Sequence, residues 1–378
     1  MKKIRKIFIS CIVLIICAIV FVACGKQGAD GINGIDGTNG KSAYEIWLDN
    51  GHAGSEADFL EWLKGASENI GKLDGSGTQT NPYTICTKEQ LIFVANQVNQ
   101  KGVTYADVNL ELKCNIDLGG TEWMPIGIMK DRKFFAGNFN GNGFKISNFK
   151  ITEEFYYAGL FGYNVGTIKN LGITDFEIDV FSFYSQFGPY VGGLVGYNDG
   201  IITNCYATGD ISATIVYSIN QTVAPSATVG GLVGRGGVDS NISNSFATGN
   251  VAIWGGEHAF AGGFMGGNNG QATNCFAIGN ISASAATNIS TMPIVGTSFV
   301  GSSITNCYWY DGQEYCQKRK TGETTGFFNP ALSYGGTVRS LEQLNNRDFY
   351  LDDLGWNISI WTFSNLDFAN GKYPTLNN

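Results

Sequence analysis

Residues 192–213 contain GGLVG at 192–196, a short turn, and then ITNCYATGDISA at 202–213. Similar text returns at 230–252 and 262–283. A looser version precedes it at 159–173, and ITNCY alone remains at 304–308. Recurrence of one short unit every 30 to 40 residues or so, about the length of one supersecondary unit, indicates a stacked array rather than a single globular core.

Each copy predicts three short strands separated by Gly and Asn corners, and in the second copy they lie near 193–196, 201–206 and 210–214. Successive coils would pair in parallel about 4.8 Å apart, so that equivalent residues stack. The alternative is a β-propeller, whose blades also repeat at about 40 residues. Propeller blades need four longer strands, and the incomplete fifth copy would leave the ring open. We therefore expect an all-β, parallel β-solenoid.

Stacking predicts columns of identical side chains. Amides would form a ladder and aromatic rings would form a stack beside it. Cys205, Cys275 and Cys307 share one repeat position with Ser245, which indicates a small buried filler. A metal site at these cysteines is not expected, because the chain has no CxxC motif and has only two histidines. The predicted ladder is Asn170, Asn204, Asn244, Asn274 and Asn306, and the predicted stack is Tyr206, Phe246, Phe276 and Tyr308.

The ends of a solenoid need covering. Residues 87–100 predict an amphipathic helix that caps the first end, ahead of strand-like stretches at 108–118 and 137–151. A second helix is expected at 340–344. Aromatic residues after it would close the other end, so that the β-helix spans 81–336 and a C-terminal cap spans 337–378. These aromatic residues include Trp356, Trp361, Phe363 and Tyr373.

The N-terminus predicts export. Residues 1–23 join a basic start to an apolar run, as secretory signals do, and FVACG at 21–25 resembles a bacterial lipobox. That resemblance implies cleavage before Cys24 and a lipid on it, which would anchor the protein to the membrane of the cell envelope. The alternative is a transmembrane anchor, for which the apolar run is short.

Residues 24–42 place Gly at every third position from Gly25 to Gly40. This collagen-like tract predicts a flexible stalk, or else a homo-oligomer held by a triple helix. A small helical hairpin is expected at 43–65 and a linker at 66–80. The net charge is −8 and becomes −12 without residues 1–23, which argues against a nucleic-acid partner.

The Gly-Leu-Val-Gly and Asn-Cys-Tyr-Ala-Thr-Gly text resembles the GLUG motif of bacterial surface adhesins and immunoglobulin A peptidase-like proteins. The resemblance covers about residues 78–376 and implies a right-handed β-helix. The peptidase relatives use a zinc-binding His-Glu-x-x-His motif. Neither His52 nor His258 has a second histidine four residues on, so the resemblance does not carry protease function to this chain.

Residues 180–190 insert five aromatic residues between the first two copies, and further insertions are expected at 216–228, 253–260 and 284–294. Insertions at one point of a repeat project from one edge and often form a binding face. Aromatic rings there would contact a glycan or a host or other extracellular protein, or else pack back onto the coil. The candidate ligand-binding residues are Phe181, Phe183, Tyr184, Phe187 and Tyr190.

Asp175, Glu177 and Asp179 alternate with apolar residues and would share one face of a strand. Such a row can bind Ca²⁺ or act as a carboxylate pair on sugar, although most rows of this kind are solvated outer faces. The chain shows no catalytic triad, phosphate-binding loop or dinucleotide fingerprint.

These features predict a non-enzymatic, lipid-anchored surface protein that uses a β-helix for adhesion or ligand binding, without a cofactor. The alternative is a polysaccharide lyase or glycosidase. It would require the three acids to share one cleft with Lys130, Arg132 and Lys133. A third hypothesis is a structural spacer.

Overall fold

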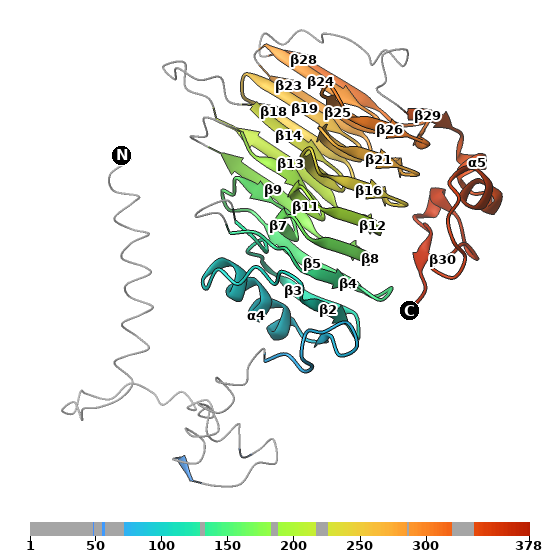
Figure 1. Ribbon diagram of the computed structural model, residues 1–378. Helices are drawn as coiled ribbons and strands as arrows, with labels where there is room; N and C mark the ends of the chain where they lie inside the picture. Colours follow the sequence, from blue (N-terminus) through green and yellow to red (C-terminus); the bar gives the residue numbers. More distant parts are fainter. Residues whose placement is uncertain are drawn as a thin grey trace, which may run out of the picture. The chain divides into compact units, whose positions relative to one another are not determined.

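The computed structural model describes residues 48, 55–56, 72–128, 133–182, 188–216, 226–285, 287–319 and 336–378. The chain divides into two units, Met1–Gly65 and Ala66–Asn378. The second unit is an all-β parallel solenoid whose coils stack along one axis (Figure 1). The predicted signal peptide, Cys24, the stalk and nearly all of the predicted helical hairpin lie outside the described residues.

The longest sheet contains two columns of strands. The first column runs parallel along the stack, and its later coils break at a corner into two short strands. It comprises β1 (Tyr83–Ile85), β2 (Asn109–Leu112), β4 (Asn138–Asn140), β8 (Thr167–Thr174), β12 (Ile201–Ala207), β16 (Asn241–Ser243), β17 (Phe246–Ala247), β21 (Gln271–Thr273), β22 (Phe276–Ala277), β26 (Ser303–Thr305), β27 (Cys307–Tyr310) and β29 (Gly336–Arg339).

The second column follows the first in each coil. It comprises β3 (Ile116–Glu122), β5 (Lys145–Ile151), β9 (Glu177–Ser182), β13 (Asp210–Ile215), β18 (Val251–Gly255), β23 (Ile281–Ala285) and β28 (Tyr315–Arg319). Alternate residues point inward to one continuous core, as Ile178, Ile211 and Val251 do. This alternation is the pattern that the sequence predicts for each copy.

Two five-stranded parallel sheets complete the coils. One comprises β7 (Phe161–Asn164), β11 (Val195–Asn198), β15 (Val233–Gly236), β20 (Met265–Asn268) and β25 (Val295–Ser298). The other comprises β6 (Tyr157–Ala158), β10 (Tyr190–Gly192), β14 (Ser226–Gly230), β19 (His258–Gly262) and β24 (Asn288–Met292).

The sheet that contains β10 corrects the prediction of three strands in each copy. Most of the insertions expected at 253–260 and 284–294 are strands β19 and β24, together with the ends of β18 and β23. The pattern is weak because the inward residues here are small, as Ala227, Ala259 and Ala261 are. Small side chains give little hydrophobic alternation for a strand to be recognised by.

The first end of the solenoid is covered as expected. Helix α4 (Lys88–Asn99) is capped by Thr87, whose side chain accepts a hydrogen bond from the backbone amide of Gln90. The Gln90 side chain in turn accepts a hydrogen bond from the backbone amide of Thr87. Its buried face, which includes Leu91 and Val94, joins the core. The helix lies at the first end of the stack of coils (Figure 1). Within the described ranges, no helix is both long and apolar enough to span a bilayer.

Residues 72–80, which the sequence assigns to a linker, belong to the first coil instead. Leu73 is buried in the solenoid core, and Asp74 forms an antiparallel bridge with Thr84. The Gly, Ser and Thr content that suggested a linker reflects turns. Gly75, for example, has a φ of 102°, which favours glycine.

The asparagine column sits at the corners of the first strand column. All five predicted residues have φ between 49° and 56°, a region that Asn tolerates better than most residues. Asn204 donates to Asn170 at 3.0 Å, Asn274 to Asn244 at 3.2 Å and Asn306 to Asn274 at 3.1 Å. The ladder of side-chain hydrogen bonds is interrupted between the second and third copies. There the Ser245 hydroxyl accepts a hydrogen bond from the backbone amide of Cys205.

Cys205, Cys275 and Cys307 are buried and unpaired. Each thiol lies 3.2–3.4 Å from the carbonyl oxygen two residues earlier, and Ser245 donates to the equivalent carbonyl at 2.7 Å. The thiols and the hydroxyl therefore fill one structural position. A disulfide joins Cys86 to Cys114 beside α4.

The C-terminal segment, residues 336–378, corrects the prediction of an end cap. It contains α5 (Leu341–Leu344), the π-helix η3 (Phe349–Asp353), β30 (Trp361–Thr362), the 3-10 helix η4 (Phe368–Asn370) and β31 (Thr375–Leu376). After β29 it runs along the side of the stack, back toward β8, rather than over the end (Figure 1). The outward rings of the aromatic column provide the apolar surface that attracts it.

In that column the rings of Tyr206, Phe246 and Phe276 stack at 5.1 and 4.7 Å, each pair within 5° of parallel. They form a second apolar core with residues of the C-terminal segment that include Trp356 and Trp361. The stack is buried although it faces away from the solenoid interior. The segment therefore replaces solvent over this column.

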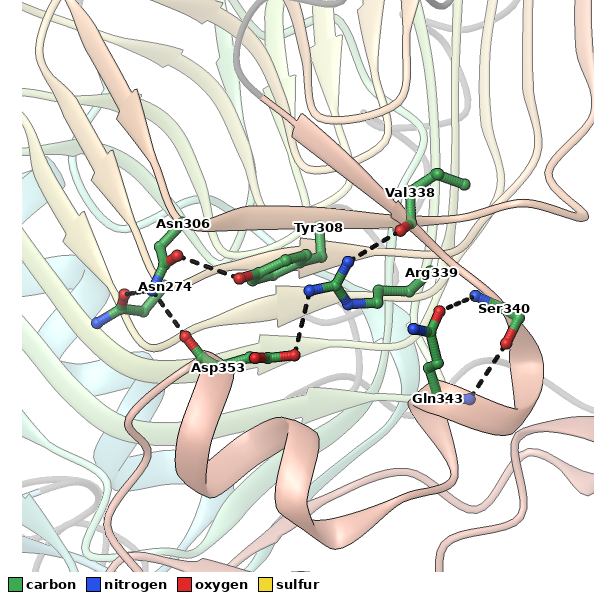
Figure 2. A network of polar contacts seen from close by, with 8 residues as sticks. All are labelled: Asn274, Asn306, Tyr308, Val338, Arg339, Ser340, Gln343 and Asp353. Atoms are coloured by element: carbon green, nitrogen blue, oxygen red, sulfur yellow. Dashed lines mark hydrogen bonds and ion pairs between the residues drawn. The ribbon is translucent and has the colours of Figure 1, made fainter.

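A polar network fixes the start of this segment to the last coils (Figure 2). The guanidinium of Arg339 lies 4.3 Å from the centre of the Tyr308 ring and donates to the Asp353 carboxylate at 3.1 Å. Asn306 donates to the backbone carbonyl of Asp353 at 2.7 Å. The asparagine ladder thus ends in a contact with the C-terminal segment.

Candidate functional site

Strand β9 places three of the predicted site residues on one outer face. Glu177, Asp179 and Phe181 point outward, and the aliphatic residues between them are buried. Asp175 precedes the strand at a corner with a φ of 54°. The predicted alternation therefore holds for Glu177 and Asp179, whereas Asp175 joins them from a turn.

A groove of about 650 Å³ runs across this face from β9 to the start of β18. All three predicted acids line it, together with Asp210, Ser212 and Asn250 from the next two coils. The groove is open to solvent along the stack. Strand register places Asp210 and Ser212 of one coil directly after Glu177 and Asp179 of the preceding coil. Such a shape fits an extended ligand better than a compact one.

The acids in the groove are held by separate partners. Glu177 pairs with Lys150 at 2.7 Å, and its hydrogen bond and charge raise the pKa of Lys150 above the ordinary value. Asp179 accepts from the Ser212 hydroxyl, and Asp210 accepts from the Asn250 backbone amide at 2.8 Å. Among the residues described, no three or more metal-ligating side chains lie close enough together to hold a metal ion. The geometry therefore gives the predicted Ca²⁺ site no support.

An exposed aromatic row borders the groove. Phe181 lies in register with Thr214, and Thr214 lies in register with Trp254 of the following coil. Phe181 is 42% exposed and Trp254 is 43% exposed, which is high for large apolar side chains. Two inter-strand steps separate the backbone positions of the two residues by about 9.6 Å. The row presents two apolar platforms beside hydrogen-bonding groups.

Tyr190 lies on a different sheet from Phe181, at the start of β10. There it belongs to a tyrosine cluster that we define as Tyr156, Tyr157, Tyr163, Tyr190 and Tyr197. The remaining candidates in the aromatic loop, Phe183, Tyr184 and Phe187, lie outside the described residues. The structure thus places the two described members of the predicted aromatic set, Phe181 and Tyr190, on different surfaces.

The hydroxyls of Tyr156 and Tyr197 remain protonated at neutral pH. Burial raises the pKa of Tyr156 and of Tyr197 to about 12. Arg235 donates to the Tyr190 hydroxyl at 3.1 Å, and the other four hydroxyls make no hydrogen bond within the described part of the chain. The cluster therefore offers neutral hydroxyls at the surface.

The arrangement of charges does not favour the alternative of a β-helix lyase or glycosidase. The acids line the groove over β9 and β13, whereas Lys133 donates to the backbone carbonyl of Asn99 at the end of α4. Lys130 and Arg132 lie outside the described residues. Acids and bases of the predicted set therefore do not share a cleft in the part of the chain that the structure covers.

The glycines of the repeated text shape the corner between β10 and β11. A Cβ atom on Gly192 would lie 2.4 Å from the Gly234 amide nitrogen of the next coil, and one on Gly196 would lie 2.7 Å from the Ala158 nitrogen. These contacts involve backbone atoms, which cannot swing aside as side chains can. Glycine is therefore required for the coils to approach each other here.

A family model for the GLUG motif matches residues 188–212, which cover this corner, strands β10 to β12 and the start of β13. The chain carries the GLUG motif. The matched span includes Tyr190 and the acid Asp210 of the groove. It covers one coil, so it identifies the repeat rather than an activity.

Two curated proteins share parts of the sequence. A "Putative Gly-rich membrane protein" of Evansella cellulosilytica is 37% identical over 134 residues, which are 34% of this chain and 15% of that protein. The protein named Halomucin of Haloquadratum walsbyi is 31% identical over 150 residues, which are 36% of this chain and 2% of that protein. The chain spans a small fraction of either relative.

The fold is similar to a crystal structure of a "putative immunoglobulin A1 protease" from Bacteroides ovatus. The TM-score is 0.54 at 24% sequence identity, over 80% of this chain and 94% of the other. This similarity supports the solenoid fold. The two histidines of the chain, His52 and His258, cannot form a His-Glu-x-x-His motif.

Sequence reasoning missed Trp254 and Arg235. Trp254 falls within a segment read as an insertion, although its strand pairs with β13 and β23. Arg235 occupies the column position of Tyr197 and Tyr163. Its one sequence signal is that a cation replaces a ring in an otherwise similar copy.

Proposed function

We propose that this protein is a lipid-anchored component of the bacterial cell envelope that binds an extended glycan along the outer face of β9, β13 and β18. The exposed row of Phe181 and Trp254 beside the groove carries this proposal. Large exposed aromatic side chains on a soluble surface are characteristic of binding sites. Sugar rings can stack on them while Asp179, Ser212 and Thr214 hydrogen-bond to sugar hydroxyls.

The location rests on two kinds of support. The N-terminal sequence has the basic start, apolar run and lipobox-like FVACG of an exported lipoprotein. One partial relative is named a membrane protein, and the Gly tract would give the solenoid reach from the membrane. Adhesion follows if the bound glycan belongs to another cell or to a host matrix.

Replacement of Trp254 by Ala is expected to weaken glycan binding by about tenfold or more, because ring stacking and its desolvated area are lost. The measurement is a glycan array followed by titration calorimetry on the best ligand. Phe181→Ala should act in the same direction. Ile201→Ala, which removes another exposed apolar side chain from a different strand column, is the matched control.

Unchanged affinity in both aromatic variants would exclude the β9 face as the binding site. Binding of the wild-type chain to extracellular proteins but to no glycan would replace the glycan by a protein ligand. Equal melting temperatures for all variants would show that the fold is intact in the comparison.

The anchor has its own test. Cells that express the full chain and are fed a labelled fatty acid should incorporate the label, and Cys24→Ala should abolish incorporation. The same variant should move the protein from the membrane fraction to the soluble fraction, because the acyl chains hold it at the membrane. Equal labelling of both forms would contradict lipidation at Cys24.

A further inference from the structure

Arg235 lies on a face separate from the β9 groove, on strand β15. Strand register places it directly after Tyr197 in the stack, and the outward side chains of β10 and β11 meet beside it. Tyr190 and Tyr197 are 5.8 Å apart between ring centres, although they belong to different sheets. The two sheets therefore converge on one aromatic surface at this point.

The guanidinium of Arg235 is held by aromatic rings and neutral oxygens. Its central carbon lies 5.2 Å from the centre of the Tyr190 ring and 4.7 Å from that of Phe299. It donates to the Tyr190 hydroxyl at 3.1 Å and to the Asn269 side-chain oxygen at 3.3 Å. Contacts with two rings and two acceptors fix the orientation of the cation before any ligand arrives.

A second arginine in the chain shows what this arrangement lacks. The guanidinium of Arg339 lies 4.3 Å from the ring centre of Tyr308 (Figure 2). It also lies 5.6 Å from the ring centre of Phe349. It pairs with the Asp353 carboxylate at 3.1 Å. Arg235 forms no ion pair within the described residues, where the paired cations are Lys113, Lys150, Arg339 and Lys372.

Arginine has five N–H donors in a planar fork, and the Arg235 contacts use two of them. The remaining donors match the geometry of a carboxylate. Around them, the tyrosine hydroxyls offer neutral hydrogen-bonding groups, and Phe299, at 42% exposed, offers an apolar face. A carboxylate attached to a sugar ring would satisfy all three features at once.

We propose that Arg235, Tyr190, Tyr197, Asn269 and Phe299 form a binding site for the carboxylate of an acidic sugar. The carboxylate of a uronic acid residue pairs with Arg235 as Asp353 pairs with Arg339. The sugar ring packs against Phe299, and the hydroxyl of Tyr197 contacts hydroxyl groups of the sugar. This site is independent of the β9 face and gives the molecule a second, charge-selective contact.

The experiment is calorimetric titration of the folded chain with short oligogalacturonate and, as a matched neutral ligand, with its methyl ester. The wild-type chain should bind the acid at least about tenfold more tightly than the ester, because the charge-assisted pair is lost in the ester. Arg235→Gln should remove that preference. Arg235→Lys, which keeps the charge but not the fork, should retain part of it.

Arg347→Gln is the control, because it makes the same charge change at an exposed arginine in the C-terminal segment. It should leave both affinities unchanged. Oligoglucuronate tests whether a different uronic acid also binds.

Three results would overturn the proposal. The first is equal binding of acid and ester by the wild-type chain, or no binding of either uronate. The second is full retention of the acid preference in Arg235→Gln. The third is equally tight binding of a polyglutamate peptide, which would assign the site to acidic proteins. Phe181→Ala should leave this binding intact, which separates this site from the β9 face.

Discussion

Replacement of Trp361 by Ala is expected to lower the free energy of unfolding by about 3–5 kcal/mol, the range for removing a large buried aromatic side chain. Trp361 is 1% exposed, and its ring lies 4.4 Å from Trp356 and 5.8 Å from Phe246 between centres. The substitution leaves a cavity between the C-terminal segment and the aromatic column. Urea unfolding followed by circular dichroism measures the change.

Two further variants separate packing from polarity at this site. The indole nitrogen of Trp361 is buried and finds no hydrogen-bond partner in the described part of the chain. Trp361→Phe removes that unsatisfied donor while it keeps an aromatic ring, so it should cost much less than Trp361→Ala. Ile358→Ala changes a residue of the same segment that is 56% exposed, and it should stay within about 0.5 kcal/mol of the wild type.

A loss in Trp361→Ala no larger than that in Ile358→Ala would show that the segment does not pack on the solenoid. Detachment of the C-terminal segment from the solenoid in Trp361→Ala would have a second consequence, besides the loss of stability. It would expose the rings of Tyr206, Phe246 and Phe276 as one continuous apolar strip, which is an aggregation hazard. Concentration-dependent light scattering of the variant tests this point.

Replacement of Gly249 by Ala is expected to cost at least the upper end of the roughly 1–3 kcal/mol that overpacking costs, and to impair folding. An added Cβ would lie 1.8 Å from the carbonyl oxygen of Gly209 in the preceding coil. Gly279 repeats the same contact, with its Cβ position 1.8 Å from the carbonyl oxygen of Gly249. Because these atoms belong to the backbone, relief requires the coils to move apart.

Gly267→Ala is the matched control on the solenoid. Its Cβ would meet a methyl group of Thr228 at 3.1 Å, a side chain that can shift. In other coils the same column holds Tyr197, Arg235 and Thr297, so the position accepts side chains. The control should lie within about 1 kcal/mol of the wild type. Equal melting temperatures for the two glycine variants would contradict the close approach at Gly249.

The sequence predicted those parts of the fold whose signal is local. The helix at Thr87 has a capping box and an apolar stripe within one short window. The asparagine corners recur with the repeat, and the cysteine positions exchange with Ser245 in register. Each of these features could be read without knowledge of distant residues, because the repeat itself supplies the neighbour.

The candidate sites were predictable only in part. Alternation along β9 located Glu177, Asp179 and Phe181 on one face, because a strand alternates regardless of its partners. It could not place Trp254 beside them, since the copies are separated by unequal lengths of chain. Arg235 belongs to no recognisable sequence pattern, and its proposed role depends on contacts with Tyr190 and Phe299 from other coils.

The sequence by itself determined that this chain stacks into a parallel solenoid, because a repeated short unit buries its apolar residues only against copies of itself. The tertiary structure decided where the segment that does not repeat would lie. That segment covers the outward aromatic column along the side of the stack, since the rings of that column form an apolar surface on which its own aromatic residues pack. It also decided which exposed groups meet, because strand register brings together residues that no local pattern connects.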